Sequence, residues 1–240
     1  LGGQIGRADL VAGTAELLAT APGGFDPRLA PDGSAVAYVA DDGLRVIDAQ
    51  GDRSVIHEDG DTISWGAAEF IAGEEMGRTR GFWWAPDSQR LLVERVDVAP
   101  IDTWWIAAPV TPAQAPLPIR YPGAGTPNAE VALVIIGLDG ERRYVEWNPT
   151  GEWEYLADAS GSSEGLILTV QTRDQRTLAV LGVDPDTGVC AERHRVTDEH
   201  WVELIPGTPR LHDGKLITVE DHGAARRLCV DGEAVTGDDL

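Results

Sequence analysis

Short apolar runs alternate with polar turns along most of the chain. The run AVAYVA is followed by Asp41-Asp42-Gly43, and the run EVALVII is soon followed by Asp139-Gly140. Strands of about four to eight residues separated by Asp-Gly turns are typical of antiparallel hairpins. No long segment has a convincing helical period of about 3.6 residues. The pattern therefore predicts a nearly all-β chain.

A coarse repeat lies on top of this alternation, in which an aromatic or apolar residue precedes a turn and then a strand. It is clearest over residues 29–48 (LAPDGSAVAYVADDGLRVID) and 83–97 (WWAPDSQRLLVERVD), and looser over 147–158. Residues 210–232 keep only the Asp-Gly turn and the strand pair. In these turns Pro fixes φ at one position. Gly suits the conformation of the position that follows, and Ser88 suits it less well. A unit repeated every roughly 40 to 60 residues predicts a β-propeller of four-stranded antiparallel blades.

One long stretch, residues 107–128 (AAPVTPAQAPLPIRYPGAGTPN), has no strand character. A loop of this length inside a compact domain is usually functional or mobile. We expect it to leave one blade as an excursion.

Large aromatic residues have a structural interpretation in such a fold. Buried aromatic area holds neighbouring blades together. We therefore expect Trp83 and Trp84 to be core residues, and we interpret Tyr121 and Trp201 in the same way.

The charge balance excludes a large class of partners. Lys and Arg number 19 against 40 Asp and Glu, a formal net charge of −21 over 240 residues. Such a chain repels a polyanion, so we expect no nucleic-acid partner. No run of about eighteen apolar residues occurs, so we expect no membrane partner either. The length suits one large β domain over residues 1–240.

Cysteine use and the first residues favour a cytoplasmic location. Cys190 and Cys229 stand alone, without the CxxC spacing of zinc or redox sites. The opening LGGQIGRADL has neither the basic region nor the apolar core of a secretion signal. We expect a cytoplasmic protein whose native N-terminus lies further upstream.

Two patterns resemble catalytic or metal motifs but lack the required context. Gly161, Ser163 and Gly165 satisfy G-x-S-x-G, the nucleophile elbow of α/β-hydrolases, which needs a helix after the serine. The β-rich run LILTVQT follows instead, so we place Ser163 in a polar hairpin loop. The five histidines include no HExxH motif and no Gly-rich phosphate loop occurs, so we predict no metal site and no cofactor. The histidines are His57, His194, His200, His212 and His222.

The adjacent carboxylates Glu74 and Glu75 are the candidate binding residues. In a chain with 40 acidic residues, an exposed and solvated pair is the default interpretation. Two carboxylates in a partly dehydrated cavity can instead hold one ammonium group through charge-assisted hydrogen bonds. Arg78 and Arg80 follow closely, and the sequence leaves open an ion pair with them that would compete with a ligand.

A series of motifs occurs in order over most of the chain: AGEEM, GFWWAPDS, RYPGAGTPNAEVALVII, EWEYLADA, LTVQTRDQ, VDPDTG, EHWVEL and HDGKLITVEDHGAARRLCV. Together they resemble the N-terminal β-propeller of bacterial dipeptidyl peptidase IV enzymes, in the prolyl oligopeptidase family of serine peptidases. Family members carry about eight blades and then an α/β-hydrolase domain with the catalytic Ser, Asp and His. The resemblance implies that residues 1–240 form an incomplete propeller, about half of one, without the catalytic domain. By itself this chain is expected to be inactive.

The resemblance also implies a role for the glutamate pair. In that family a double glutamate in the propeller receives the free α-ammonium of the peptide substrate, and Glu74-Glu75 matches this motif. Holding the N-terminus at a set distance from the nucleophile makes the enzyme release dipeptides. The implied role is substrate gating and N-terminus recognition without catalysis. The implied partners are the peptide N-terminus and the protein's own C-terminal α/β-hydrolase domain.

Two further expectations concern assembly and an alternative function. A propeller that does not close leaves open blade faces and strand edges, so self-association is expected. The alternative is a stand-alone β-propeller that acts as a protein-interaction scaffold, with its acidic surface docking a basic partner. Under this alternative the glutamate pair has no special role.

Overall fold

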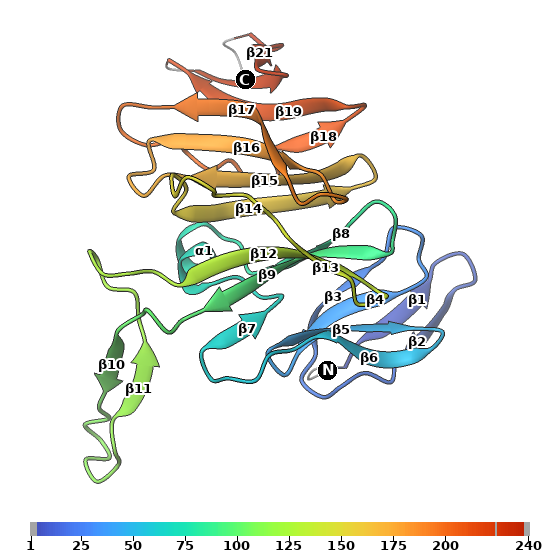
Figure 1. Ribbon diagram of the computed structural model, residues 1–240, viewed down its shortest axis with the longest axis vertical. Coiled ribbons are helices and arrows are strands. Elements are labelled where there is room, and N and C mark those ends of the chain that lie inside the picture. The colour runs from blue at the N-terminus through green and yellow to red at the C-terminus, as the bar shows by residue number, and fades with distance from the viewer. Residues whose placement is uncertain (1–3, 224, 238–240) are drawn as a thin grey trace.

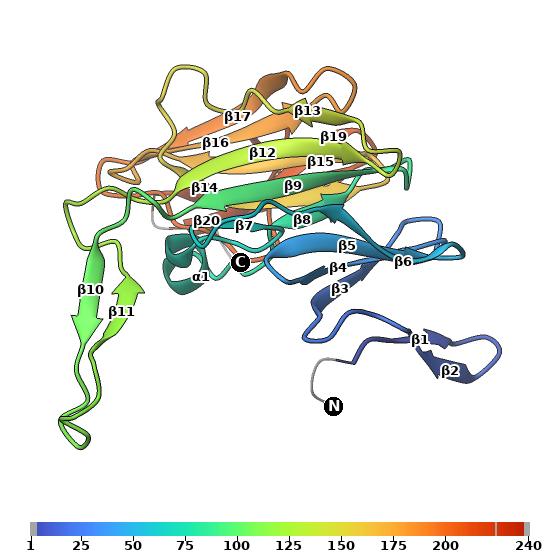
Figure 2. The same cartoon turned by 60° about the horizontal axis from the view of Figure 1, so that its bottom comes forward.

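Strands predominate in the computed structural model, which describes residues 4–223 and 225–237 (Figure 1). Four antiparallel sheets follow one another along the chain and stack side by side (Figures 1 and 2). We call them blades 1 to 4 in chain order. In the described part of the chain, no helix is long and apolar enough to span a membrane.

Blades 1, 3 and 4 share one topology, in which each of four strands pairs with the next in sequence. Tight turns make this possible: Asp41 and Asp42, between the second and third strands of blade 1, have φ of 53° and 55°, as a type I′ hairpin turn requires. Blade 1 contains β3 (Phe25–Leu29), β4 (Val36–Ala40), β5 (Gly43–Asp48) and β6 (Gly51–Ile56). Blade 3 contains β14 (Tyr155–Ser162), β15 (Gly165–Gln171), β16 (Thr177–Val183) and β17 (Cys190–Thr197). Blade 4 contains β18 (Arg210–His212), β19 (Lys215–His222), β20 (Ala225–Val230) and β21 (Glu233–Ala234).

Blade 2 differs because its edge strand is interrupted. Its long strands β9 and β12 pair with each other, and β13 pairs with the far side of β12. On the other side, β7 and β8 both pair with β9, and the segment between them leaves the sheet. The strands of blade 2 are β7 (Ile63–Trp65), β8 (Phe82–Trp84), β9 (Arg90–Asp97), β12 (Glu130–Gly137) and β13 (Arg142–Tyr144).

The repeat in the sequence corresponds to the early strands of three blades. Residues 29–48 reach from β3 through β5, residues 83–97 cover β8 and β9, and residues 210–232 cover β18 to β20. Ser88 has φ 57°, a left-handed conformation that residues other than glycine rarely adopt. Residues 147–158 are out of phase, because their turn precedes β14 and connects blades 2 and 3. The predicted all-β fold of four-stranded propeller blades is confirmed, and the propeller is not closed.

The Trp pair of β8 contributes to two blade interfaces at once. Successive side chains of a strand point to opposite faces. Trp83 therefore packs between blades 2 and 3, and Trp84 between blades 1 and 2, where its Nε1–H donates to the carbonyl of Arg28 at 3.0 Å. Both are nearly buried, at 5% and 6% exposure, so the core prediction is confirmed for them. The blade 2–3 cluster also holds Leu92, Leu133, Leu168 and Leu181, and the blade 1–2 cluster holds Val39, Leu44, Leu91 and Ile136.

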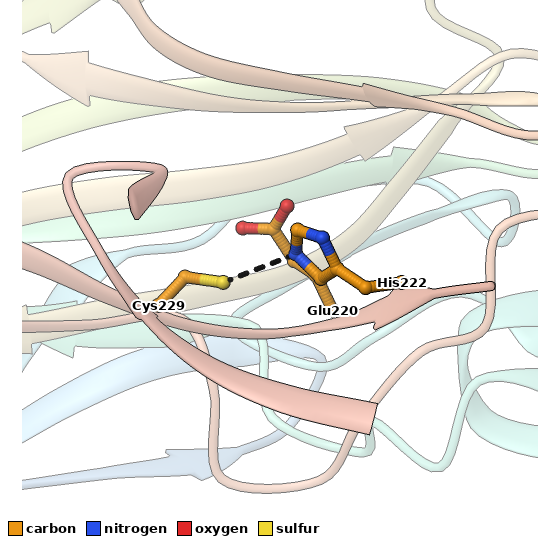
Figure 3. A group of neighbouring side chains, drawn as sticks. All are labelled: Glu220, His222 and Cys229. Carbon is orange, nitrogen blue, oxygen red and sulfur yellow. Dashed lines mark hydrogen bonds between the residues drawn. The ribbon is translucent and has the colours of Figure 1, made fainter. Parts of the chain in front are cut away.

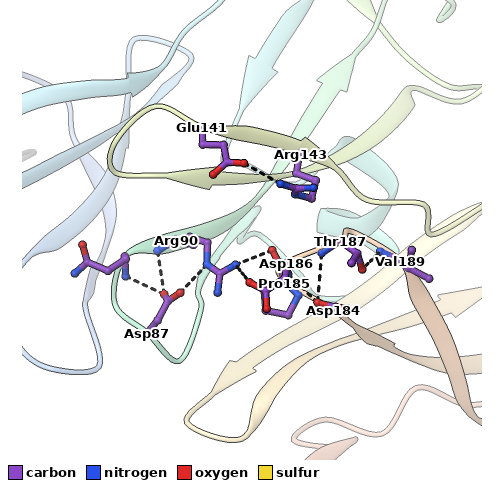
Figure 4. Close-up of polar contacts among 10 residues, drawn as sticks. Asp87, Arg90, Glu141, Arg143, Asp184, Pro185, Asp186, Thr187 and Val189 are labelled. Carbon is purple, nitrogen blue, oxygen red and sulfur yellow. Dashed lines mark hydrogen bonds and ion pairs between the residues drawn. The ribbon is translucent and has the colours of Figure 1, made fainter.

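A polar clamp between blades 2 and 3 is built on the VDPDTG turn (Figure 4). Arg90 of β9 donates to the carbonyl of Pro185 at 2.8 Å and to Asp186 Oδ1 at 2.6 Å. Asp87 holds the same guanidinium at Nε, 2.6 Å away. Within the turn, Asp184 Oδ1 accepts the N–H of Asp186 at 2.8 Å. The motif therefore acts as a contact between blades.

A two-stranded hairpin projects from blade 2 between β9 and β12 (Figure 1). It pairs β10 (Thr103–Ile106) with β11 (Leu117–Arg120), so the prediction that residues 107–128 lack strand character is wrong. An isolated ribbon has only edge strands, which accept a proline such as Pro118. The excursion from one blade is therefore an arm with its own strand pairing.

Tyr121 and Trp201 lie outside the blade core, contrary to expectation. Tyr121 follows the arm, is 40% exposed and contacts the rings of Phe70 and Trp104, each with centroids 5.4 Å apart. Trp201 is 60% exposed in the connection between blades 3 and 4. Both lie in connections between strands, which the blade faces do not cover.

The N-terminal segment packs against the face of blade 1 that is turned away from blade 2. Ile5 joins a small apolar cluster with Tyr38 of β4. The hydroxyl of Tyr38 accepts the N–H of Ala21 at 2.8 Å. A separate hairpin of β1 (Gly6–Asp9) and β2 (Thr14–Leu17) lies beside this contact.

Candidate functional site

The glutamate pair lies in a segment that leaves the edge of blade 2 and returns to it. This segment, residues 66–81, connects β7 to β8, and we call it the 66–81 insertion. Its two ends meet at Glu94 of β9. Gly66 N–H donates to the Glu94 carbonyl at 2.9 Å, and Glu94 N–H donates to the Gly81 carbonyl at 2.7 Å. Both ends of the insertion are therefore hydrogen-bonded to the same residue of blade 2, Glu94.

Glycine is required at both ends of this insertion. Gly66 has φ 82°, a left-handed conformation that side chains rarely adopt. At Gly81 an added Cβ would lie 2.6 Å from the backbone of Ala67, which crosses beside it. The close approach of the two chain segments forms a narrow neck.

The short helix α1 (Phe70–Glu75) presents the glutamate pair. Its N-cap is Glu69, whose carboxylate accepts the N–H of Ile71 at 2.7 Å and of Ala72 at 2.6 Å. Ala72 alone is buried in the helix, which ends at the C-cap Met76. A helix of six residues is too short to produce a recognisable period, so the sequence did not predict it.

Glu74 and Glu75 are exposed at the C-terminal end of α1. No basic residue lies in the last turn of the helix. In the part of the chain that the structure describes, no hydrogen bond or ion pair involves either side chain. Two adjacent carboxylates without a cation partner create a negative potential that favours a positively charged ligand.

Arg78 and Arg80 are paired with other groups. Arg78 is buried and forms a close ion pair with Glu94, and its guanidinium also donates to the carbonyls of Arg80 at 2.7 Å and Leu156 at 2.8 Å. Arg80 Nε lies 3.5 Å from Asp26 Oδ2 of blade 1. The competing ion pair that the sequence left open is therefore not formed in this structure.

The residues that follow α1 line an open cavity of about 400 Å³. Met76–Arg80 form one wall, and all four blades contribute to the rest. The contributions include Arg28 of β3, Trp83 of β8, Asp158 of β14 and Arg210 of β18. These are edge strands of successive blades, so the cavity occupies the place of a propeller's central channel. The glutamate pair immediately precedes its wall.

Arginine side chains predominate among the charged groups that line the cavity. Arg28, Arg80 and Arg210 come from three different blades and line it together with Asp158. The sequence does not reveal this grouping, because the fold alone brings these residues together. Guanidinium groups carry several N–H donors and no acceptor, so this part of the cavity favours ligands with carbonyl or carboxylate oxygens.

Ser163 lies in the hairpin turn between β14 and β15, as predicted, and no helix follows it. The neighbouring Glu164 carboxylate accepts the N–H of Asp213 at 2.9 Å and of Gly214 at 2.7 Å in blade 4. The GSSEG segment therefore fastens two blades together.

Comparison with known proteins adds independent information. The family model described as "Dipeptidyl peptidase IV (DPP IV) N-terminal region" matches residues 9–230. Human dipeptidyl peptidase 8 is 25% identical over an alignment of 169 residues, which covers 61% of this chain and 19% of that protein. The mouse protein of the same name is 23% identical over the same shares.

Two solved structures share the fold at low sequence identity. Dipeptidyl peptidase 4 of Porphyromonas gingivalis superposes with a TM-score of 0.80 at 18% identity, over 95% of this chain and 34% of that one. A putative dipeptidyl aminopeptidase IV of Bacteroides ovatus gives 0.77 at 20% identity, over 98% and 33%. The chain thus spans about a third of these structures and less than that of its curated relatives. The match over residues 9–230 establishes that the chain belongs to the dipeptidyl peptidase IV N-terminal region family.

Proposed function

We propose that this chain is the non-catalytic, substrate-gating part of a dipeptidyl peptidase, and that Glu74 and Glu75 bind the α-ammonium of the peptide substrate. The observation that carries the proposal is the position of the pair. Both carboxylates are exposed and unpaired within the described residues, on an insertion that leads into the channel-like cavity. The residues that directly follow the pair line this cavity, which supports a role for the pair at the entrance of a short peptide.

The chemistry of an ammonium group suits this arrangement. It has three N–H donors and no acceptor, so two carboxylates satisfy it better than one. Hydrogen bonds to charged groups contribute about 1.5 to 3 kcal/mol each. The neck at Gly66 and Gly81, with Arg78 bound to Glu94, holds α1 at a fixed place on blade 2. A fixed anchor sets the distance from the substrate N-terminus to the nucleophile of a hydrolase domain.

Replacing the pair in the full-length protein tests this function. We expect Glu74→Gln or Glu75→Gln to lower kcat/KM for a dipeptide-releasing substrate by about 10- to 150-fold, the equivalent of one lost charged hydrogen bond. Glu199→Gln combined with Asp59→Asn is the matched control, because both residues are acidic and exposed and neither lines the cavity. If both glutamate variants keep the parent kcat/KM, the recognition role is wrong and the scaffold function is favoured.

A further inference from the structure

A cluster of chemically reactive side chains lies on one face of blade 4, away from the glutamate pair. Glu220 and His222 are two residues apart on β19, so they project from the same face of the sheet. Cys229 lies on the neighbouring strand β20, opposite Thr218 in the register. One ligand atom from each of Glu220, His222 and Cys229 lies within 4.8 Å of the others. Figure 3 shows the three side chains turned toward one another.

The spacing of these atoms matches a tetrahedral metal site. Zinc binds Cys sulfur, His nitrogen and carboxylate oxygen at about 2.0 to 2.3 Å, which places neighbouring ligand atoms of a tetrahedron about 3.3 to 3.8 Å apart. Cys229 Sγ lies 3.4 Å from His222 Nε2. The carboxylate oxygen of Glu220 lies within 4.8 Å of both of these atoms, so a small adjustment of its side chain would bring the third ligand into such a geometry.

A histidine from blade 3 contacts the carboxylate of this cluster. His194 of β17 places Nε2 2.8 Å from Glu220 Oε1, and this buried nitrogen has no hydrogen bond of good geometry. The hydroxyl of Thr218 donates to the same oxygen. Both neighbours act on Oε1, which leaves Oε2 of Glu220 for a ligand. Outer partners of this kind orient metal-binding carboxylates.

We propose that Glu220, His222 and Cys229 bind one Zn²⁺ ion, with His194 as a positioning residue that orients Glu220. Binding replaces the S–H bond of Cys229 with a sulfur–zinc bond and releases the proton to solvent, with no change in oxidation state. A water molecule completes the four-coordinate site. Because His194 belongs to blade 3 and the ligands to blade 4, the ion strengthens the contact between these two blades.

The sequence did not indicate this site, because the ligands follow no compact motif. Glu220 and His222 lie on one strand of a hairpin and Cys229 lies on the other, and only the strand register brings them together. Arg227 lies opposite Glu220 in that register, and its positive charge opposes a cation.

A second acidic and histidine group, Glu164, His212 and Asp213, is exposed, and its Glu164 already accepts two backbone N–H groups. We assign no ion to that group.

Cobalt titration of the chelator-treated chain tests the proposal, because Co²⁺ bound to a thiolate produces a near-ultraviolet charge-transfer band. We expect one Co²⁺ per chain, displaced by Zn²⁺, with the band abolished in Cys229→Ser. Cys190→Ser is the matched control and keeps the band. Among the described residues, Cys190 of β17 belongs to no group of three potential metal ligands, so that thiol does not supply the signal.

Two histidine variants separate a metal site from a simple thiol–imidazole contact. His222→Asn, at the accessible end of β19, is expected to lose at least tenfold in Co²⁺ affinity. His194→Gln is expected to lose about 10- to 100-fold while its charge-transfer band is retained at saturation. His212→Gln is the control for the other group and should leave the affinity unchanged. Absence of the band in the parent chain, its presence in Cys229→Ser, or unchanged affinity in His222→Asn overturns the proposal.

Discussion

At the residue scale, one buried ion pair connects the fold to the candidate site. Glu94 is fully buried at the point where the 66–81 insertion leaves blade 2, and Arg78 returns from the insertion to pair with it. Burial holds the pKa of Glu94 above its ordinary value, and the guanidinium of Arg78 opposes this shift. The pair thus fixes the segment that follows the glutamate pair.

Removing Arg78 is therefore expected to be costly. Arg78→Met leaves the Glu94 carboxylate buried without its cation, which should lower the free energy of unfolding by about 3 to 5 kcal/mol. Denaturant unfolding measures this change. The control is Arg143→Met, which breaks an exposed pair with Glu141 and should cost less than about 1 kcal/mol. Similar losses in the two variants would argue against a structural role for the buried pair.

At the element scale, the sequence predicted the strands well and the connections poorly. Regular alternation and Asp-Gly turns located blades 1, 3 and 4, because each is a simple series of hairpins. Helix α1 was missed because six residues are too few to show a recognisable helical period. The strand β11 was missed because Pro118 argues against a strand inside a sheet but not in a free ribbon. The conformation of a connecting segment depends on the residues that it packs against, and these are distant in the sequence.

The hairpin turn at Glu164 provides a pH-dependent test of a blade contact. The N–H groups of Gly214 and then Asp213 hold the pKa of Glu164 below its ordinary value. The contact therefore contributes fully above the unfolded pKa of about 4.3, and the contribution is lost as pH falls through the lower folded pKa. We expect the Gly214 amide chemical shift to titrate with a midpoint below that value, and Glu164→Gln to abolish the transition. A midpoint at or above the ordinary value would contradict the contact.

At the scale of the whole molecule, the order of blades places distant residues around one cavity. The sequence supplied the glutamate pair through a resemblance, and residue types alone left its partners open. Only the fold could place Arg78 on Glu94, Arg80 near Asp26, and the residues that directly follow the glutamates in the lining of the channel-like cavity. Self-association through the open blade faces stays a prediction. The assignment of the pair now depends on how it responds to a charged amine.

The most direct test compares one dipeptide-releasing substrate with its N-acetylated form in the full-length protein and in its Glu74→Gln/Glu75→Gln variant. Acetylation removes the ammonium, and the variant removes the carboxylates, so the two changes form a double-mutant cycle on kcat/KM. Recognition of the amine predicts a preference for the free N-terminus of at least tenfold in the parent protein and close to none in the variant. An equal preference in both proteins, or no preference in the parent, would contradict the central claim.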